Sequence, residues 1–186
     1  MLIKNARVYG LDNSFRVSKF PKTVDADLCN SEFTDTIYKL STCTKGSGHD
    51  NFLKGIVIQF DLTFTIKAWV EAERYHWFDI VSSQSTMHKI SGMDFEKCLC
   101  SYVTDNTKNE ITKLRDKYND TNDPEDYLRL LYNCPTGLML TAGITTNYQQ
   151  LKTIYAQRRA HRLPEWRCFC EWIEELPYSE LITGEL

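Results

Sequence analysis

The chain has 186 residues, a formal net charge of −3, 42% hydrophobic residues and 25% charged residues. These values are typical of a globular protein with its own core, and they predict a single domain over residues 1–186. They exclude a collagenous or disordered chain, and the absence of basic excess argues against nucleic-acid binding. No apolar run approaches the roughly 18 residues of a membrane span, and the N-terminus does not resemble a signal peptide. We therefore expect a cytoplasmic protein with no membrane partner and no specific nucleic-acid partner.

The seven cysteines indicate reduced thiols, because their number is odd and no signal peptide precedes them. Two pairs have C-x-C spacing, Cys98 with Cys100 and Cys168 with Cys170. Zinc sites use longer spacers of two to four residues. We therefore predict no metal site and interpret Cys100 and Cys170 as small buried hydrophobic residues.

The clearest predicted element is a strand over residues 56–64. Its apolar residues alternate with Val57, Gln59, Asp61 and Thr63, which is the period of a half-buried strand. No proline interrupts the alternation, so we expect this strand to be central in the sheet, with Phe60 and Leu62 buried. Residues 65–78 then follow helical spacing, and residues 79–92 are predicted to form a polar loop.

Capping signals predict four helices in the second half of the chain. They begin at the capping box of Thr107 and Glu110, at Asp123-Pro124, at Thr146 or Asn147, and at Pro164. The first two end near Asn119 and Tyr132. The chain therefore reads as one domain of mixed α and β structure.

Arg74-Tyr75-His76 is the first candidate site, because it ends the first helix and precedes a segment rich in hydroxyl groups. An arginine guanidinium offers a planar set of donors that suits phosphate, and a histidine adds a donor. The alternative is an ordinary helix C-terminus, where cations favour the helix dipole.

A second candidate is the basic cluster in this acidic chain. Its members are Arg158, Arg159, His161, Arg162 and Arg167. Such a cluster points to an anionic ligand such as a phosphate, and the alternative is a helix end with solvated arginines. His88 and His161 have no partner at a metal-like spacing, so we expect both at the surface. No motif marks a catalytic nucleophile.

The order of these features resembles the flavin-dependent thymidylate synthases. Their Gly-His-Glu segment is matched by Ser47-Gly48-His49-Asp50, and a strand and a helix then lead to Arg74-Tyr75-His76, where the family has the motif RHRxxSxNExSxR. The later match is to a Leu-Pro turn, an Asn-initiated helix that carries an Arg, and a Gln-Trp-Glu helix. Here those positions hold Cys134-Pro135, Thr146-Asn147, Leu151, Arg158 and Glu165-Trp166.

Several motif positions differ from the family. Tyr75 stands where the family has His, and His76 stands where it has Arg. The Glu, Ser and Arg of the ExSxR half fall near Ser82, Gln84 and Thr86, which replace a carboxylate and a guanidinium poorly.

The resemblance implies an α+β fold, with an antiparallel or mixed sheet and packed helices in a single domain. It implies a homotetramer with active sites shared between subunits. The implied ligands are FAD, a pyrimidine nucleotide of the dUMP type, methylene-tetrahydrofolate and NADPH. In the family the flavin carries the hydride while a one-carbon unit is transferred to the pyrimidine, and no enzyme cysteine attacks the ring.

The resemblance also implies site residues, although it identifies no catalytic side chain here. The expected FAD-binding residues are His49, Arg74, His76 and Asn147. The expected nucleotide-binding residues are Ser83, Gln84, Ser85, Thr86 and Arg158. The alternative is a non-catalytic relative that keeps the fold and acts as a nucleotide-binding or interaction protein, for instance in a virus or mobile element.

Two further expectations concern assembly and the arginines. Trp69, Trp77 and Trp166 are many large apolar side chains for a small domain to hide, which favours a homo-oligomer. Arg74 and Arg158 are expected to converge in one anion-binding pocket, where neither is needed for the core.

Overall fold

The computed structural model describes residues 1–44 and 46–184 and contains a four-stranded antiparallel sheet. The strands are β1 (Leu2–Tyr9), β2 (Val57–Thr65), β3 (Phe78–Ser83) and β4 (Met139–Asn147), in the order β1-β2-β4-β3. Strand β2 pairs with β4 so that Phe60 lies opposite Ile144. The predicted central strand is confirmed, with Phe60 3% and Leu62 0% exposed.

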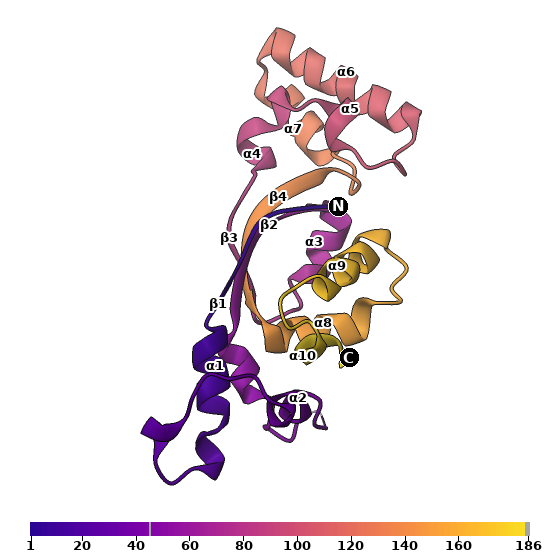
Figure 1. The fold of residues 1–186 in the computed structure, drawn as a ribbon. Helices are drawn as coiled ribbons and strands as arrows, with labels where there is room; N and C mark the ends of the chain where they lie inside the picture. The colour runs from indigo at the N-terminus through magenta and orange to yellow at the C-terminus, as the bar shows by residue number, and fades with distance from the viewer. Residues whose placement is uncertain (45, 185–186) are drawn as a thin grey trace.

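Helices cover one face of this sheet (Figure 1). They are α3 (Ile66–Ala72), α8 (Tyr148–Arg158), α9 (Pro164–Glu174) and α10 (Glu180–Thr183). The main hydrophobic core lies between these helices and the sheet, where Phe64 packs on Trp166 and Phe169. The other face of β2 and β4 carries polar side chains, which bond across the strands from Gln59 to Thr145.

The remaining helices gather at the two ends of the sheet (Figure 1). At one end lie α1 (Leu11–Ser18) and α2 (Asp35–Ser41). At the other lie α4 (Thr86–Lys89), α5 (Phe95–Cys98), α6 (Asp105–Thr121) and α7 (Pro124–Tyr132), which build a second hydrophobic cluster. Short 3-10 turns occupy Phe20–Lys22, Ala26–Leu28, Asn51–Gly55 and Ile90–Gly92. Leu140 of β4 packs against both clusters and so connects them.

The predicted helix starts are confirmed where a side chain caps the helix. Asp123 accepts a hydrogen bond from the backbone N–H of Glu125 at 2.8 Å and begins α7. Asn147, rather than Thr146, caps α8. The start of α6 lies earlier than predicted, because Thr104 provides its cap.

Two predicted segments differ from the structure. The expected loop over residues 79–92 begins with strand β3, and the expected helix over residues 65–78 ends at Ala72. The helix stops early because the chain turns at Arg74 to bury Tyr75, which is 8% exposed. Strand β3 escaped prediction because it lies at the sheet edge, where Phe78 is its only buried residue.

The tryptophans do not behave as expected. Trp69 is 9% and Trp166 is 0% exposed within the single chain, so the domain does hide these two and they give no support for a homo-oligomer. Trp77 remains 53% exposed. Cys170 is buried as predicted, and burial raises its pKa to about 12, whereas Cys100 is only half-buried.

The described part of the chain contains no helix long and apolar enough to cross a membrane.

Candidate functional site

A cavity of about 670 Å3 lies between the turn before β2, the start of β3 and α8. We call it the α8 cavity. Its walls include Gly48, Asp50, Asn51, Trp77, Gln149 and Lys152. Ligand pockets are commonly about 300–1,000 Å3 in volume, so this cavity has room for a ring system.

The charges on the wall of the α8 cavity neutralise one another. The Lys152 Nζ atom lies 2.8 Å from Asp50 Oδ2 and also donates to the carbonyl oxygen of Ser41. Gln149 donates to the other oxygen of Asp50 at 3.2 Å. Lys152 is therefore already paired, and it is the one cation that lines this cavity among the residues that the structure describes.

Trp77 supplies an aromatic wall to this cavity. Its backbone is held at two points, since its N–H donates to Gln150 Oε1 at 3.3 Å and its carbonyl oxygen accepts from Thr146. The indole itself is 53% exposed, and the His76 ring lies edge-on at 5.0 Å. A fixed backbone with an open ring face can stack on a planar ligand.

None of the four residues predicted to bind FAD lines this cavity, although each lies within three positions of a residue that does. Asn147 caps α8 through Oδ1, which accepts from Gln150 N at 2.9 Å, so only its amide nitrogen is left to donate. Arg74 and His76 are exposed and flank the turn that leads to Trp77. His49 is exposed between Gly48 and Asp50, but its side chain lines a neighbouring cavity that contacts α1 and α2.

The predicted nucleotide-binding segment lies at the far end of β3. Phe78 pairs with Thr146 beside the α8 cavity, whereas Ser83 pairs with Ala142. At about 3.3 Å per residue, the two ends of β3 are about 17 Å apart. Within one chain, therefore, the structure does not bring the hydroxyl-rich segment to the α8 cavity.

Local contacts also occupy part of that segment. Gln84 Oε1 accepts from the backbone N–H of Thr141 at 2.9 Å and extends the sheet. Ser85 Oγ lies 2.9 Å from His88 Nδ1, and Thr86 begins α4.

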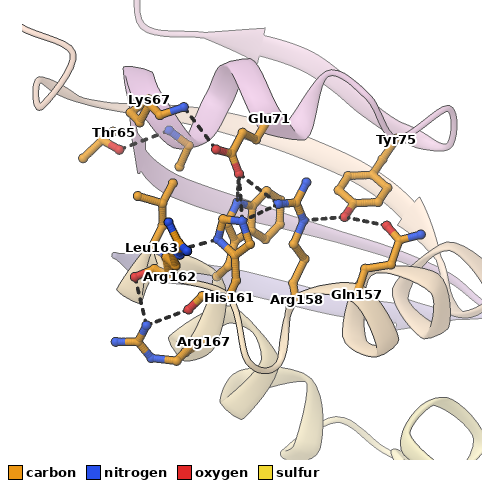
Figure 2. A network of polar contacts seen from close by, with 12 residues as sticks. Thr65, Lys67, Glu71, Tyr75, Gln157, Arg158, His161, Arg162, Leu163 and Arg167 are labelled. Carbon is orange, nitrogen blue, oxygen red and sulfur yellow. Dashed lines mark hydrogen bonds and ion pairs between the residues drawn. The ribbon is translucent and has the colours of Figure 1, made fainter.

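Arg158 lies elsewhere than predicted, because it points into the protein between α3 and α9 (Figure 2). Its Nη1 atom donates to Glu71 Oε2 at 2.9 Å, and its Nε atom donates to the hydroxyl of Tyr75 at 2.6 Å. The guanidinium also stacks on Trp166, 4.9 Å from the ring centroid. The expectations that Arg158 binds a phosphate beside Arg74 and is not needed for packing therefore do not agree with the structure.

Glu71 is the centre of this network, and it was not among the residues predicted from the sequence. Its carboxylate also accepts from Trp166 Nε1 at 3.2 Å and from Lys67 Nζ at 3.1 Å. Burial would raise the pKa of Glu71, but the hydrogen bond from Lys67 and the charges of His161, Lys67 and Arg158 hold it below its ordinary value. The signal in the sequence was the spacing of Lys67 and Glu71, which places them on one helix face.

His161 is half-buried in the same network and does not lie free at the surface. Its Nε2 atom lies 3.4 Å from Glu71 Oε2, and its Nδ1 atom accepts from the backbone N–H of Leu163. Within residues 1–44 and 46–184, no group of three His, Cys, Asp or Glu side chains is placed to hold a metal ion.

The α8 cavity fits a flavin nucleotide in its chemistry. The open Trp77 ring suits a planar isoalloxazine or base, and the amides of Gln149 and Gln150 suit its polar edge. The diphosphate would need a cation from outside the cavity wall, because Lys152 is paired with Asp50. Arg74 does not line the cavity, but it lies three positions before Trp77, is exposed, and makes no side-chain hydrogen bond or ion pair with the described residues.

Comparisons with known proteins gave matches in structure only. No family model matches the sequence, and no curated protein matches it. A crystal structure of a flavin-dependent thymidylate synthase from Helicobacter pylori, complexed with FAD and dUMP, aligns with a TM-score of 0.77 at 12% identity. A second structure of that enzyme with FAD and dUMP gives a TM-score of 0.76 at 13% identity. Each alignment covers 100% of this chain and 98% of the other. Over its whole length, the chain therefore has the fold of the flavin-dependent thymidylate synthases.

Proposed function

We propose that the protein is a divergent flavin-dependent thymidylate synthase-like protein that binds FAD in the α8 cavity. The observation that carries the proposal is that the cavity joins three parts of the chain that the family resemblance singled out: the segment around His49, the turn after Arg74, and the start of α8. The match over the whole chain to a structure with FAD and dUMP supports the same ligands here.

In this proposal each wall of the cavity has a distinct role. Trp77 stacks on the planar ring, and the amides of Gln149 and Gln150 fix its orientation. Arg74 and His76, which lie just before Trp77 in the chain and are exposed, hold the diphosphate. When bound, the flavin supplies the redox chemistry for transfer of a one-carbon unit from methylene-tetrahydrofolate to a pyrimidine nucleotide, with NADPH as the reductant.

A Trp77→Ala change is expected to weaken FAD binding about tenfold, since an aromatic stacking contact contributes about 1–3 kcal/mol. Flavin fluorescence quenching on titration with FAD measures the affinity. Tyr132→Ala is the matched control, because Tyr132 is 83% exposed on α7, away from the cavity. A colourless wild-type protein that does not bind added FAD would contradict the proposal.

The second candidate function is a non-catalytic relative that keeps a nucleotide site. It is favoured by Arg158, whose guanidinium is bound to Glu71 instead of facing a cavity. A thymidylate assay with dUMP, methylene-tetrahydrofolate and NADPH separates the two candidates. FAD binding without thymidylate formation supports the non-catalytic relative.

We also propose that the protein is a cytoplasmic homo-oligomer, as a tetramer of the family type. Exposed Trp77 and the distance of Ser83 from the α8 cavity support this assembly, because a second subunit would bring its own Ser83–Thr86 segment to the site. Light scattering at micromolar concentration is expected to give a multiple of 21.7 kDa. A mass of one chain would contradict the shared site.

A further inference from the structure

A second cavity, of about 560 Å3, lies where α9 begins, between the start of α3 and the loop that precedes α6. We call it the α9 cavity. It is separate from the α8 cavity, and the proposed function does not use it. Arg162 and Arg167 of the basic cluster both line it, whereas Arg158 of the same cluster lies in the interior.

The α9 cavity carries an excess of positive charge. Lys67, Arg162 and Arg167 line it, and Glu165 is the only acidic lining residue among those the structure describes. Glu165 accepts a hydrogen bond from Thr65 Oγ1 at 2.8 Å. Lys67 is paired with Glu71 at 3.1 Å, so the excess positive charge comes from Arg162 and Arg167, and in a protein of net charge −3 it forms a local field that attracts anions.

Arg162 and Arg167 differ in how their guanidinium groups are held. Arg167 Nη1 donates to the carbonyl oxygens of His161 at 2.7 Å and Arg162 at 3.0 Å, which fixes the guanidinium (Figure 2). Its Nε and Nη2 donors make no hydrogen bond with the described residues. The Arg162 side chain is exposed and likewise has no partner in the described chain. Both guanidiniums can therefore donate to an anion without breaking an existing bond.

The backbone at the start of α9 also favours an anionic ligand. Helix α9 has 11 residues and begins with Leu163 at the N-cap and Pro164 at the first position, and no side chain caps it. Pro164 has no N–H, and the N–H of Trp166 donates to the carbonyl oxygen of Leu163 at 3.2 Å, so the first turn leaves the N–H of Glu165 for a ligand, and the helix dipole favours a negative charge.

The segment before α6 adds an aromatic side chain to the lining of the cavity. Tyr102 lines the cavity and is 80% exposed, so its ring is free to pack against a flat group. Beside it, the hydroxyls of Thr104 and Thr107 lie 3.0 Å apart and can bond to polar groups of a ligand.

We propose that the α9 cavity binds a phosphate monoester carried on a planar ring system. The phosphate lies between Arg162 and Arg167 at the start of α9, and the ring packs on Tyr102. Charge-assisted bonds from arginine to phosphate provide most of the affinity, and the aromatic contact selects nucleotide-like esters over simple sugar phosphates.

Titration calorimetry with AMP and with ribose 5-phosphate, at low salt and without phosphate buffer, tests the proposal. Wild type is expected to bind both, AMP more tightly. Arg162→Gln and Arg167→Gln are each expected to weaken AMP about tenfold or more, the effect of losing a hydrogen bond to a charged group. Arg7→Gln, an exposed change of equal charge on β1, is the control and is expected to bind as wild type.

Two further variants test the ring contact and the independence of the α9 cavity from the α8 cavity. Tyr102→Ala is expected to weaken AMP but not ribose 5-phosphate. Trp77→Ala is expected to leave AMP binding unchanged while weakening FAD, so failure of the flavin proposal would be seen separately. Circular dichroism checks that each variant is folded. If Arg167→Gln is misfolded, the AMP affinity of Arg162→Gln decides the result. The proposal is overturned if wild type binds neither probe, if Arg162→Gln binds as Arg7→Gln does, or if Tyr102→Ala affects both probes equally.

Discussion

Phe60→Ala is expected to lower the free energy of unfolding by about 3–5 kcal/mol, the usual cost of removing a buried phenylalanine ring. Phe60 is 3% exposed on the central strand β2. Its ring centroid lies 4.8 Å from that of Trp172 and 5.9 Å from that of Phe169, so the cavity left behind would open beneath α9. Urea denaturation followed by circular dichroism measures the loss.

Phe20→Ala is the matched control for this prediction. Phe20 is 36% exposed in a short turn after α1, and its ring contacts only the guanidinium of Arg16 among the ring contacts described. Surface substitutions usually change stability by less than about 0.5 kcal/mol. Similar losses for Phe60→Ala and Phe20→Ala would contradict the central position of β2.

The elements that were predictable from the sequence are those specified by neighbouring residues. Strand β2 shows its alternation within nine residues, and the Asp123-Pro124 pair marks the start of α7 by itself. Strand β1 is different, because it lies at the sheet edge and most of its residues are exposed, so no alternation marks it. Its place is set by pairing with β2, which lies about fifty residues later in the sequence.

The candidate site was predictable only in part for the same reason. The basic residues from Arg158 to Arg167 were visible as a cluster, but the cluster does not show which of them has a partner. Arg158 meets Glu71, 87 residues away, whereas Arg162 remains unpaired within the described chain. The basic cluster in the sequence therefore correctly predicted an excess of positive charge in this region. Which arginine faces solvent is determined by the tertiary fold.

Glu71→Ala is expected to lower the free energy of unfolding by about 3–5 kcal/mol, because it would leave a buried charge without its partner. The side chain of Arg158 is only 12% exposed, and its ion pair with Glu71 has a length of 2.9 Å. The indole N–H of Trp166 would lose its acceptor at the same time. Urea denaturation at pH 7 measures the loss, with Lys67→Ala as the control, since Lys67 is 56% exposed and its pair is expected to contribute less than about 1 kcal/mol.

The pH dependence of stability gives an independent test of the same network. The pKa of Glu71 is lowered in the folded chain from its ordinary value of 4.5. The folded state therefore favours the ionised carboxylate of Glu71 more than the unfolded state does, and ionisation of Glu71 stabilises the fold. The stabilisation is therefore complete above about pH 5 and is lost as the pH falls through the lowered pKa. The difference in unfolding free energy between wild type and Glu71→Gln is expected to shrink as the pH falls below 4.5. A difference that does not change with pH would mean that the stabilising contact does not depend on the charge of Glu71.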